Sequence, residues 1–365
     1  SKACATSENE ELLEEKRTVE PTAEVLYEYE RGYYIERLKR RKYEFDSQLV
    51  RPYLAYEQVR AGVMDVAAKL FGVEFRLNNE IQRWHDSVDV FDMLDGGEVV
   101  ARLFLDMHPR DDKYKHAAMF DMTTGRAGGP IPEGVLICNF PEPKDGDPGL
   151  MMFDQVTTYF HEFGHLLHYL FSGNQRFQAF GGIATEWDFV EVPSQLFEEW
   201  AWDPAILAGF ALHHETGEAI PPELVQKLRA AEEYGKGLQA NGQMLYAMLA
   251  LSYYETDPKG LDTTERLIEL KKQIMFSPHE EGTHMQAAFG HLNGYSAMYY
   301  TYMWSLVISK DFFSMFQGDL MNTETATAYR NKVTGRGGEA DADDLCTDFL
   351  GREYGFEAFE AWLNA

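Results

Sequence analysis

The segment from His161 to His165 reads His-Glu-Phe-Gly-His, and its side chains could hold a metal ion. Residues four apart share one face of a helix, so both imidazoles could bind the same ion. Glu162 would flank that ion and could take a proton from a metal-activated water molecule. The motif also occurs by chance, but here it lies in the largely apolar run 151–170. Such a run would not bury two histidines and a glutamate without a reason, so the pattern predicts a catalytic zinc site.

A catalytic zinc site needs a third protein ligand and keeps one position open. The stretch 185–195 contains three carboxylates. Glu191 lies 26 residues after His165, which leaves room for a loop and a returning helix. On spacing alone, Glu186 competes with Glu191 as the ligand. Asp188 could accept the other N–H of a zinc-bound imidazole and fix its tautomer.

Other polar side chains near the motif have plainer interpretations. A third histidine ligand just after the motif is excluded, because His168 and Phe171 stand where a glycine and that histidine would be required. His168 shares the face of His161, and as a fourth ligand it would close the site, so a packed or hydrogen-bonded role is favoured. We expect Glu198 and Glu199 to be solvated.

A tyrosine-rich segment further along could also take part in chemistry. Tyr295, Tyr299 and Tyr302 are spaced four and three apart, so they share one helical face. They follow Gly290 and Gly294, which permit a mobile loop. Such a stripe is more often core packing, but a phenol O–H is also a suitable donor to an oxyanion.

Composition narrows the partners and the compartment. With 60 acidic and 33 basic residues, the formal net charge is -27, which disfavours nucleic acid and anionic lipid as partners. No apolar run is long enough for a transmembrane helix. The three cysteines, Cys4, Cys138 and Cys346, are odd in number and far apart, so we expect reduced thiols and a cytoplasmic protein.

The elements that must position these residues are mostly helices. Residues 1–24 are acidic and predict a flexible arm, followed by one catalytic domain over 25–365. A small sheet is expected within 73–140. Helices are expected at 23–43, 56–71, 150–170, 194–200, 222–235, 243–254, 263–275 and 296–316. The predicted fold class is therefore mainly α with a small β-sheet.

The motif together with the run Asp-Phe-Val-Glu-Val-Pro-Ser-Gln at 188–195 resembles the thimet oligopeptidase family, peptidase family M3. Segments 104–118, 289–304, 335–338 and 349–352 extend the resemblance from about Tyr33 to the C-terminus. It implies a zincin-like (gluzincin) catalytic domain with one zinc ion, held by His161, His165 and Glu191 rather than Glu186.

The resemblance also implies a role for the tyrosine-rich loop. In the family, a histidine and tyrosines of this loop contact the scissile carbonyl. By position His291 and Tyr302 match them, with Tyr295 and Tyr299 alongside. The expected activity is hydrolysis of internal bonds in short peptides. The alternatives are a peptidyl-dipeptidase of the same family and an inactive, zinc-stabilised peptide-binding protein. A zinc aminopeptidase is disfavoured, because the sequence has no GxMEN segment.

One departure from the family concerns length. Its members carry a long helical N-terminal region that walls off a deep channel, and most of that region has no counterpart here. The chain is then either a fragment or a minimal form. A minimal form is expected to have a more open groove, or to close it as a homodimer.

Overall fold

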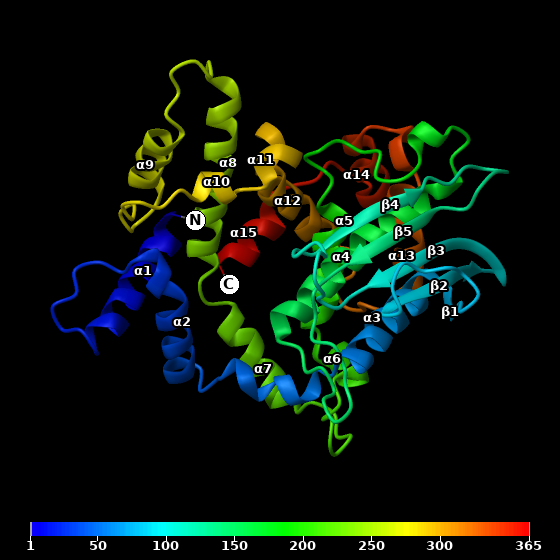
Figure 1. Cartoon of the computed structure of the whole chain (residues 1–365), viewed down its shortest axis with the longest axis horizontal. Coiled ribbons are helices and arrows are strands. Elements are labelled where there is room, and N and C mark those ends of the chain that lie inside the picture. The colour runs from blue at the N-terminus through cyan, green and yellow to red at the C-terminus, as the bar shows by residue number, and fades with distance from the viewer. Residues whose placement is uncertain (1, 365) are drawn as a thin grey trace. The chain divides into compact units, whose positions relative to one another are not determined.

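The computed structural model describes residues 2–364, which form two compact units (Figure 1). Unit 1 comprises the described residues of 1–46, 226–306 and 359–365, and unit 2 comprises 47–225 and 307–358. The chain passes from one unit to the other four times: between residues 46 and 47, and within the helices α7 (Pro222–Glu232), α12 (Thr301–Ser314) and α15 (Glu357–Asn364). Among the described residues, no helix combines the length and apolar character that a membrane span requires.

Unit 1 is helical. Its elements are α1 (Lys2–Arg17), α2 (Glu28–Lys42), α8 (Lys236–Glu255), α9 (Thr263–Ile274), α10 (Met285–Ala288), α11 (His291–Gly294) and a 3-10 turn at Ser296–Tyr300. One core joins α1, α2 and α8 through Ala5, Leu12, Leu38 and Leu238. The helices predicted at 23–43, 243–254 and 263–275 correspond to α2, α8 and α9.

The N-terminal segment differs from the flexible arm expected there. Residues 2–17 form α1, whose Ala5 and Leu12 are fully buried. Three of its acidic side chains, Glu8, Glu11 and Glu15, have partners within unit 1. The Glu8 carboxylate accepts the backbone N–H groups of Gly237 and Leu238 at 3.1 and 2.8 Å. The sequence shows the charge of these residues but not the partners that compensate it, which come from distant helices.

Unit 2 is built on a five-stranded sheet. The strands are β1 (Glu74–Leu77), β2 (Val88–Asp95), β3 (Glu98–Asp106), β4 (Ala118–Thr123) and β5 (Glu133–Ile137), in the order β1-β2-β3-β5-β4. Only β3 and β5 run parallel. The hairpin between β2 and β3 turns at Gly96 and Gly97, both with positive φ, which favours glycine. In the strand order given above, β1 and β4 lie at the two edges of the sheet.

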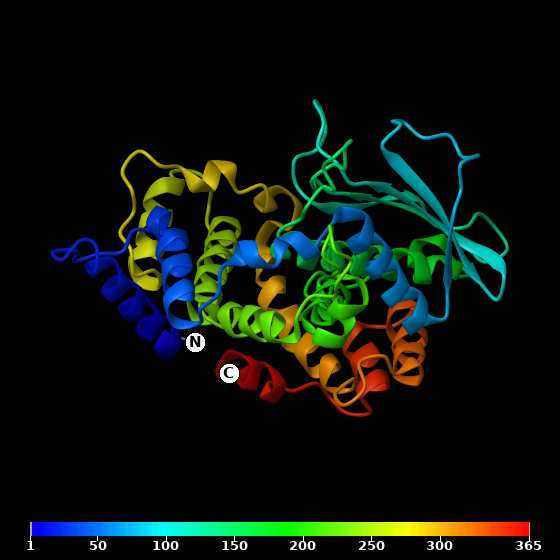
Figure 2. The same ribbon diagram turned by 90° about the horizontal axis from the view of Figure 1, so that it is seen from below.

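The helices of unit 2 are α3 (Tyr56–Phe71), α4 (Phe153–Phe171), α5 (Val192–Glu198), α6 (Pro204–Phe210), α13 (Thr323–Tyr329), a π-helical turn (Arg330–Thr334) and α14 (Ala342–Leu350). Of these, α3 and α4 contact this sheet, and the other helices pack on them or on the neighbouring turns. Short 3-10 turns occupy Ser47–Leu49, Arg51–Tyr53, Ser172–Asn174, Gln178–Phe180, Glu199–Trp202 and Gly337–Glu339. α4 contacts β3, β4, β5 and α5, and Figure 2 shows the cyan strands as one layer with green α4 beside it. The predicted fold class, mainly α with a small sheet, is confirmed.

Candidate metal centre

Helix α4 presents His161 and His165 from one face, one turn apart. The rings lie 5.0 Å apart between centroids and nearly perpendicular, at 83°. Phe160, Phe163 and Leu166 on other faces of α4 are fully buried, which fixes the helix against its neighbours. The helical spacing in the sequence therefore brings the two imidazoles together.

Glu191 supplies a carboxylate from the residue that caps the start of α5. Its Oε2 lies 3.2 Å from the Nε2 of His161 and 3.0 Å from the Nε2 of His165. The Ser194 hydroxyl donates to the same oxygen at 3.0 Å and to the Glu191 carbonyl at 2.8 Å. Glu186, the competing carboxylate, instead accepts the backbone N–H of Ala342 at 3.0 Å.

The donor set of this triad fits a metal ion. The ligand atoms of His161, His165 and Glu191 all lie within 4.8 Å of one another. Glu191 is 1% exposed, and a buried carboxylate facing two imidazoles needs positive charge nearby. Two nitrogens and one oxygen, with a fourth position left over, match the ligand pattern of catalytic zinc.

The charges within the triad stabilise one another. Burial alone would raise the pKa of Glu191, but His165 and the hydrogen bonds from both imidazoles hold it well below its ordinary value. Burial alone would lower the pKa of His161, but hydrogen bonds to Glu191 and Glu198 raise it well above its ordinary value. A divalent cation held by neutral imidazoles would supply the positive charge that the buried Glu191 carboxylate needs.

Glu198 contacts the ring nitrogen of His161 that faces away from Glu191. Its Oε1 lies 2.6 Å from the Nδ1 of His161. Such a role was predicted for Asp188, and Glu198 was predicted to be solvated; the prediction for Glu198 is wrong. Glu198 lies seven residues after Glu191, about two turns along the same helical segment, which is the signal that could have identified it.

The Nδ1 of His165 is buried and has no hydrogen-bond partner among the described residues. His168 is 1% exposed, and burial lowers its pKa to about 3, so it is held as a neutral imidazole. It packs beside the triad without joining the group of ligand atoms that could hold the ion.

Glu162 lies next to the ligands and away from water. It is 8% exposed, and burial raises its pKa above the ordinary value despite the opposing effect of the two imidazoles. The backbone N–H of Met119 on the edge strand β4 donates to its carboxylate. The side chain is therefore oriented by the sheet and has a raised affinity for a proton.

The tyrosine-rich segment forms a ring cluster in unit 1. The His291 ring lies 5.4 Å from Tyr295, 5.3 Å from Tyr299 and 5.7 Å from Tyr302, between centroids. Tyr299 is buried, and its hydroxyl donates to Gln243 at 3.0 Å. His291 is exposed and Tyr295 and Tyr302 are half-buried. A side chain added at Gly290 or Gly294 would meet open space.

Residues 2–364 match the model of peptidase family M3. The chain belongs to peptidase family M3. Oligopeptidase A of Escherichia coli K12 is 33% identical over 332 residues, covering 88% of this chain and 49% of the relative. Dipeptidyl carboxypeptidase of the same strain is 33% identical over 333 residues, covering 88% and 48%.

Saccharolysin of Saccharomyces cerevisiae is 30% identical over 354 residues, covering 91% of this M3 chain and 49% of the relative. The chain thus spans about half the length of the curated relatives it matches. Among solved structures, PZ peptidase A with an inhibitor aligns with a TM-score of 0.51 at 13% identity, covering 71% of this chain and 42% of that one. A structure of BsuCP gives 0.51 at 11%, covering 98% and 73%. These two similarities support the fold.

Proposed function

We propose that this M3 chain hydrolyses internal bonds of short peptides and uses one zinc ion held by His161, His165 and Glu191. The observation that carries the proposal is the convergence of those three side chains beside the buried carboxylate of Glu162. The similarity to oligopeptidase A supports the choice of peptides as substrates.

Glu162 acts as the general base. A zinc ion at the triad would supply a Lewis acid that polarises the peptide carbonyl and favours deprotonation of the attacking water. Glu162 takes the proton as water attacks and passes it to the leaving amine. Its raised pKa moves the carboxyl towards the operating pH, which suits a group that must both take up and release a proton. The Met119 N–H keeps the carboxylate oriented.

The His-Tyr cluster contacts the substrate. From the match of this loop to the family's substrate loop, we assign Tyr302 and His291 as donors to the oxyanion that develops on the attacked carbonyl. Tyr295 contributes a neighbouring substrate contact, stacked on Tyr302 at 5.3 Å between ring centroids. Gly290 and Gly294 let the loop adjust. Tyr299 acts here mainly by supporting the cluster from its buried position.

Replacing the base tests the proposal. Glu162→Gln keeps the size of the side chain but cannot accept the proton, so turnover should fall about 10²–10⁴-fold. Zinc content, measured by elemental analysis, should stay near one ion per chain. His161→Ala should lose both the metal and the activity. Turnover near the wild-type level in Glu162→Gln would show that the base is misassigned.

A second candidate is a peptidyl-dipeptidase, favoured by the equal identity to dipeptidyl carboxypeptidase. Products from a length series of peptides, mapped by mass spectrometry, separate the two. An oligopeptidase cuts at internal positions, whereas a peptidyl-dipeptidase releases only C-terminal dipeptides at every length. A chain that binds zinc and peptides but yields no chelator-sensitive cleavage would be a peptide-binding protein instead.

A further inference from the structure

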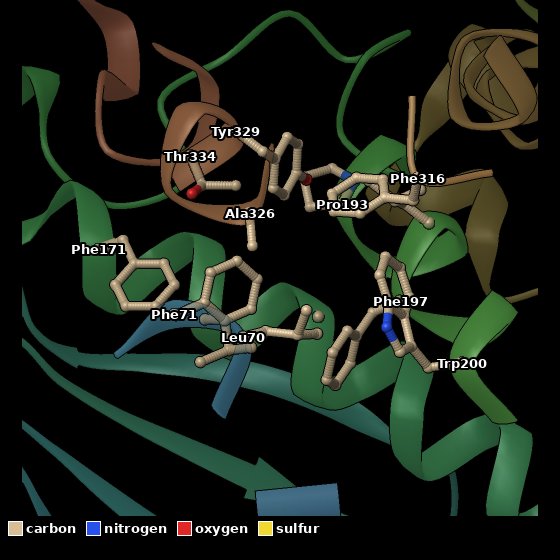
Figure 3. A pocket seen from close by; sticks show the side chains of 13 residues that line it. Leu70, Phe71, Phe171, Pro193, Phe197, Trp200, Phe316, Ala326, Tyr329 and Thr334 are labelled. Atoms are coloured by element: carbon tan, nitrogen blue, oxygen red, sulfur yellow. The ribbon is translucent and has the colours of Figure 1, made fainter. Parts of the chain in front are cut away.

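The contact between Glu162 and Met119 joins two elements of unit 2 that are held in different ways. Helix α4, which carries Glu162, is fixed by packing. Its Phe160 and Phe163 are fully buried. On a further face of α4, Phe171 and its neighbours line a small apolar cavity together with side chains of α3, α5 and α13, as Figure 3 shows. The position of the carboxylate is therefore set by the core.

Strand β4, which carries Met119, depends more on hydrogen bonds. It lies at an edge of the sheet, and among the described strands it pairs with β5. Its Phe120 and Met122 side chains are 40% and 45% exposed, so they contribute little packing. Backbone with few buried apolar contacts opens easily. The Met119 N–H stays on Glu162 only if hydrogen bonds fix the start of β4.

The chain reaches β4 through an irregular segment, residues 107–117. The Lys113 ammonium holds the first part of this segment. It is buried, and it donates to the backbone carbonyls of Asp106, His108 and Cys138 at 2.9, 2.6 and 2.5 Å. This bridge fixes the segment to the ends of β3 and β5, but it does not reach the residues that lead directly into β4.

Asn139 holds those residues. Its side-chain amide donates to the backbone carbonyls of Tyr114 and His116, at 3.0 and 3.2 Å. His116 lies two residues before Ala118, the first residue of β4. A carbonyl oxygen can only accept, so the amide must present its NH₂ group here. A side chain without two donors cannot replace it.

The backbone on both sides of Asn139 is itself anchored. The N–H of Cys138 donates to the Asp106 carbonyl at 2.9 Å, and the N–H of Phe140 donates to the Met107 carbonyl at 2.8 Å. These bonds continue the pairing with β3 beyond the end of β5. The Asn139 side chain reaches to the other side, where it adds two hydrogen bonds to the pairing of β5 with β4.

We propose that Asn139 is a positioning residue for the general base, because it fixes the start of β4 and so holds the Met119 N–H against Glu162. The proposal rests on the role of Glu162 in the proposed function. A carboxylate without this fixed donor can turn away from the attacking water, and a displacement of about 1 Å costs up to roughly 100-fold in rate. Asn139→Ala should therefore lower kcat about 10–100-fold and leave KM and zinc content near the wild-type values.

Hydrogen exchange of the whole chain tests the positioning step without any turnover. Asn139→Ala should raise deuterium uptake over residues 114–123, measured by mass spectrometry, because the start of β4 loses two anchors. Asn78→Ala is the matched control. Asn78 also lies just past the end of a strand, and its amide donates to Asp92 at 2.8 Å at the opposite edge of the sheet. It should leave kcat and the uptake over 114–123 unchanged. Unchanged uptake over 114–123 in Asn139→Ala would overturn the proposal.

A double-mutant cycle connects the effect to the base. In the Glu162→Gln background no base is left to orient, so adding Asn139→Ala should lower the residual kcat by less than about twofold. A loss as large as in the wild-type background would overturn the proposal. Turnover of Glu162→Gln near the wild-type level would instead contradict the proposed function, and the exchange experiment would still decide whether Asn139 fixes β4. Asn139→Ser, which keeps one shorter donor, gives the same comparisons with smaller changes should Asn139→Ala fail to fold.

Discussion

Glu198 fixes the orientation of a predicted metal ligand. Its oxygen lies 2.6 Å from the Nδ1 of His161, which leaves the Nε2 facing Glu191. A carboxylate in this position selects the tautomer of the imidazole and makes it a stronger donor to a metal. Only a third of the Glu198 side chain is exposed, so the contact is partly shielded from water.

Removing this carboxylate should weaken metal binding. Glu198→Ala is expected to lower zinc affinity about 10–100-fold, and Glu198→Gln, which keeps an acceptor, should lose less. A competition titration with a chromogenic chelator measures the change. Glu199→Gln is the matched control, because the neighbouring Glu199 pairs with Lys310 instead. It should lower stability but not zinc affinity. Equal zinc affinities in the Glu198 and Glu199 variants would contradict this role.

A second buried carboxylate organises the loop after β3. Asp106 is 1% exposed and accepts from Arg110 at 2.6 and 2.7 Å and from the Trp84 indole at 2.9 Å. The Lys113 ammonium lies 3.0 Å from it and also donates to three backbone carbonyls. Burial would raise the pKa of Asp106, but these donors lower it to about 2.

This shift predicts a dependence of stability on pH. The folded pKa lies below the unfolded value of about 3.9, so the stabilisation is present above about pH 4 and is lost as the pH falls towards 2. Asp106→Asn should cost about 3 kcal/mol at neutral pH, because it leaves the buried Lys113 and the partly buried Arg110 without their anion. Urea unfolding of both proteins between pH 7 and 2 should show the difference shrinking in acid.

The control for this series is Asp65→Asn, which breaks an exposed pair with Lys69. Such pairs contribute little, so its effect should stay below about 1 kcal/mol at every pH. A difference between wild type and Asp106→Asn that stays constant down to pH 2 would contradict the assignment to Asp106.

The sequence identifies side chains whose chemistry depends on local spacing. His161, His165 and Glu162 follow from the four-residue helical repeat, and Glu191 from the family resemblance. Glu198 was missed because its role depends on where α5 lies beside α4. No pattern within either helix encodes that placement, although the seven-residue step from Glu191 is consistent with it.

At the scale of secondary-structure elements, the placement of α5 on α4 depends on one glycine, Gly164. A Cβ built on Gly164 would lie 2.6 Å from the Pro193 carbonyl oxygen and 2.8 Å from the Ser194 Cα. Both atoms are backbone, so no side-chain movement can relieve the overlap. The glycine thus permits the close approach that sets Glu191 opposite the two histidines.

Gly164→Ala should therefore separate the two helices. We expect a loss of about 1–3 kcal/mol of stability, as for other overpacked cores, together with weaker zinc binding. Gly209→Ala is the control, because a Cβ at that position in α6 meets nothing within 4 Å. It should stabilise the chain slightly, by roughly 0.5–1 kcal/mol, since alanine is the better helix former. Unfolding in urea and a zinc competition titration measure both effects, and unchanged zinc affinity in Gly164→Ala would count against this geometry.

Helices and strands with a clear hydrophobic periodicity could be predicted from the sequence, and elements without it could not. The Tyr56–Phe71 helix was predicted with the observed bounds because Val59, Val63 and Leu70 repeat on its buried face. β1 could not be placed from the sequence, since its four residues are mostly exposed and an alternation of only Phe75 and Leu77 is too short to be distinctive. α1 was predicted to be a flexible arm because its own sequence is acidic. The contacts that fix it come from helices far along the chain, and its sequence does not show them.

At the scale of the whole molecule, charge is the dominant feature. The formal net charge of -27 creates a negative field that raises the local concentration of cations and repels anions. Salt screens this field, since the Debye length falls from about 30 Å at 0.01 M to about 10 Å at 0.1 M. The field should therefore act on substrate encounter more strongly at low salt.

For the proposed peptidase, this predicts a salt-dependent preference among peptides. A peptide with lysines outside the cleaved bond should have a higher kcat/KM than a neutral analogue at about 0.01 M salt, because the field favours its approach. The advantage should shrink several-fold at about 0.3 M, and a glutamate analogue should show the opposite trend. The slopes of kcat/KM against salt for the three peptides measure the effect. Parallel slopes would mean that the field does not reach the approaching substrate, and that the acidic residues serve solubility alone.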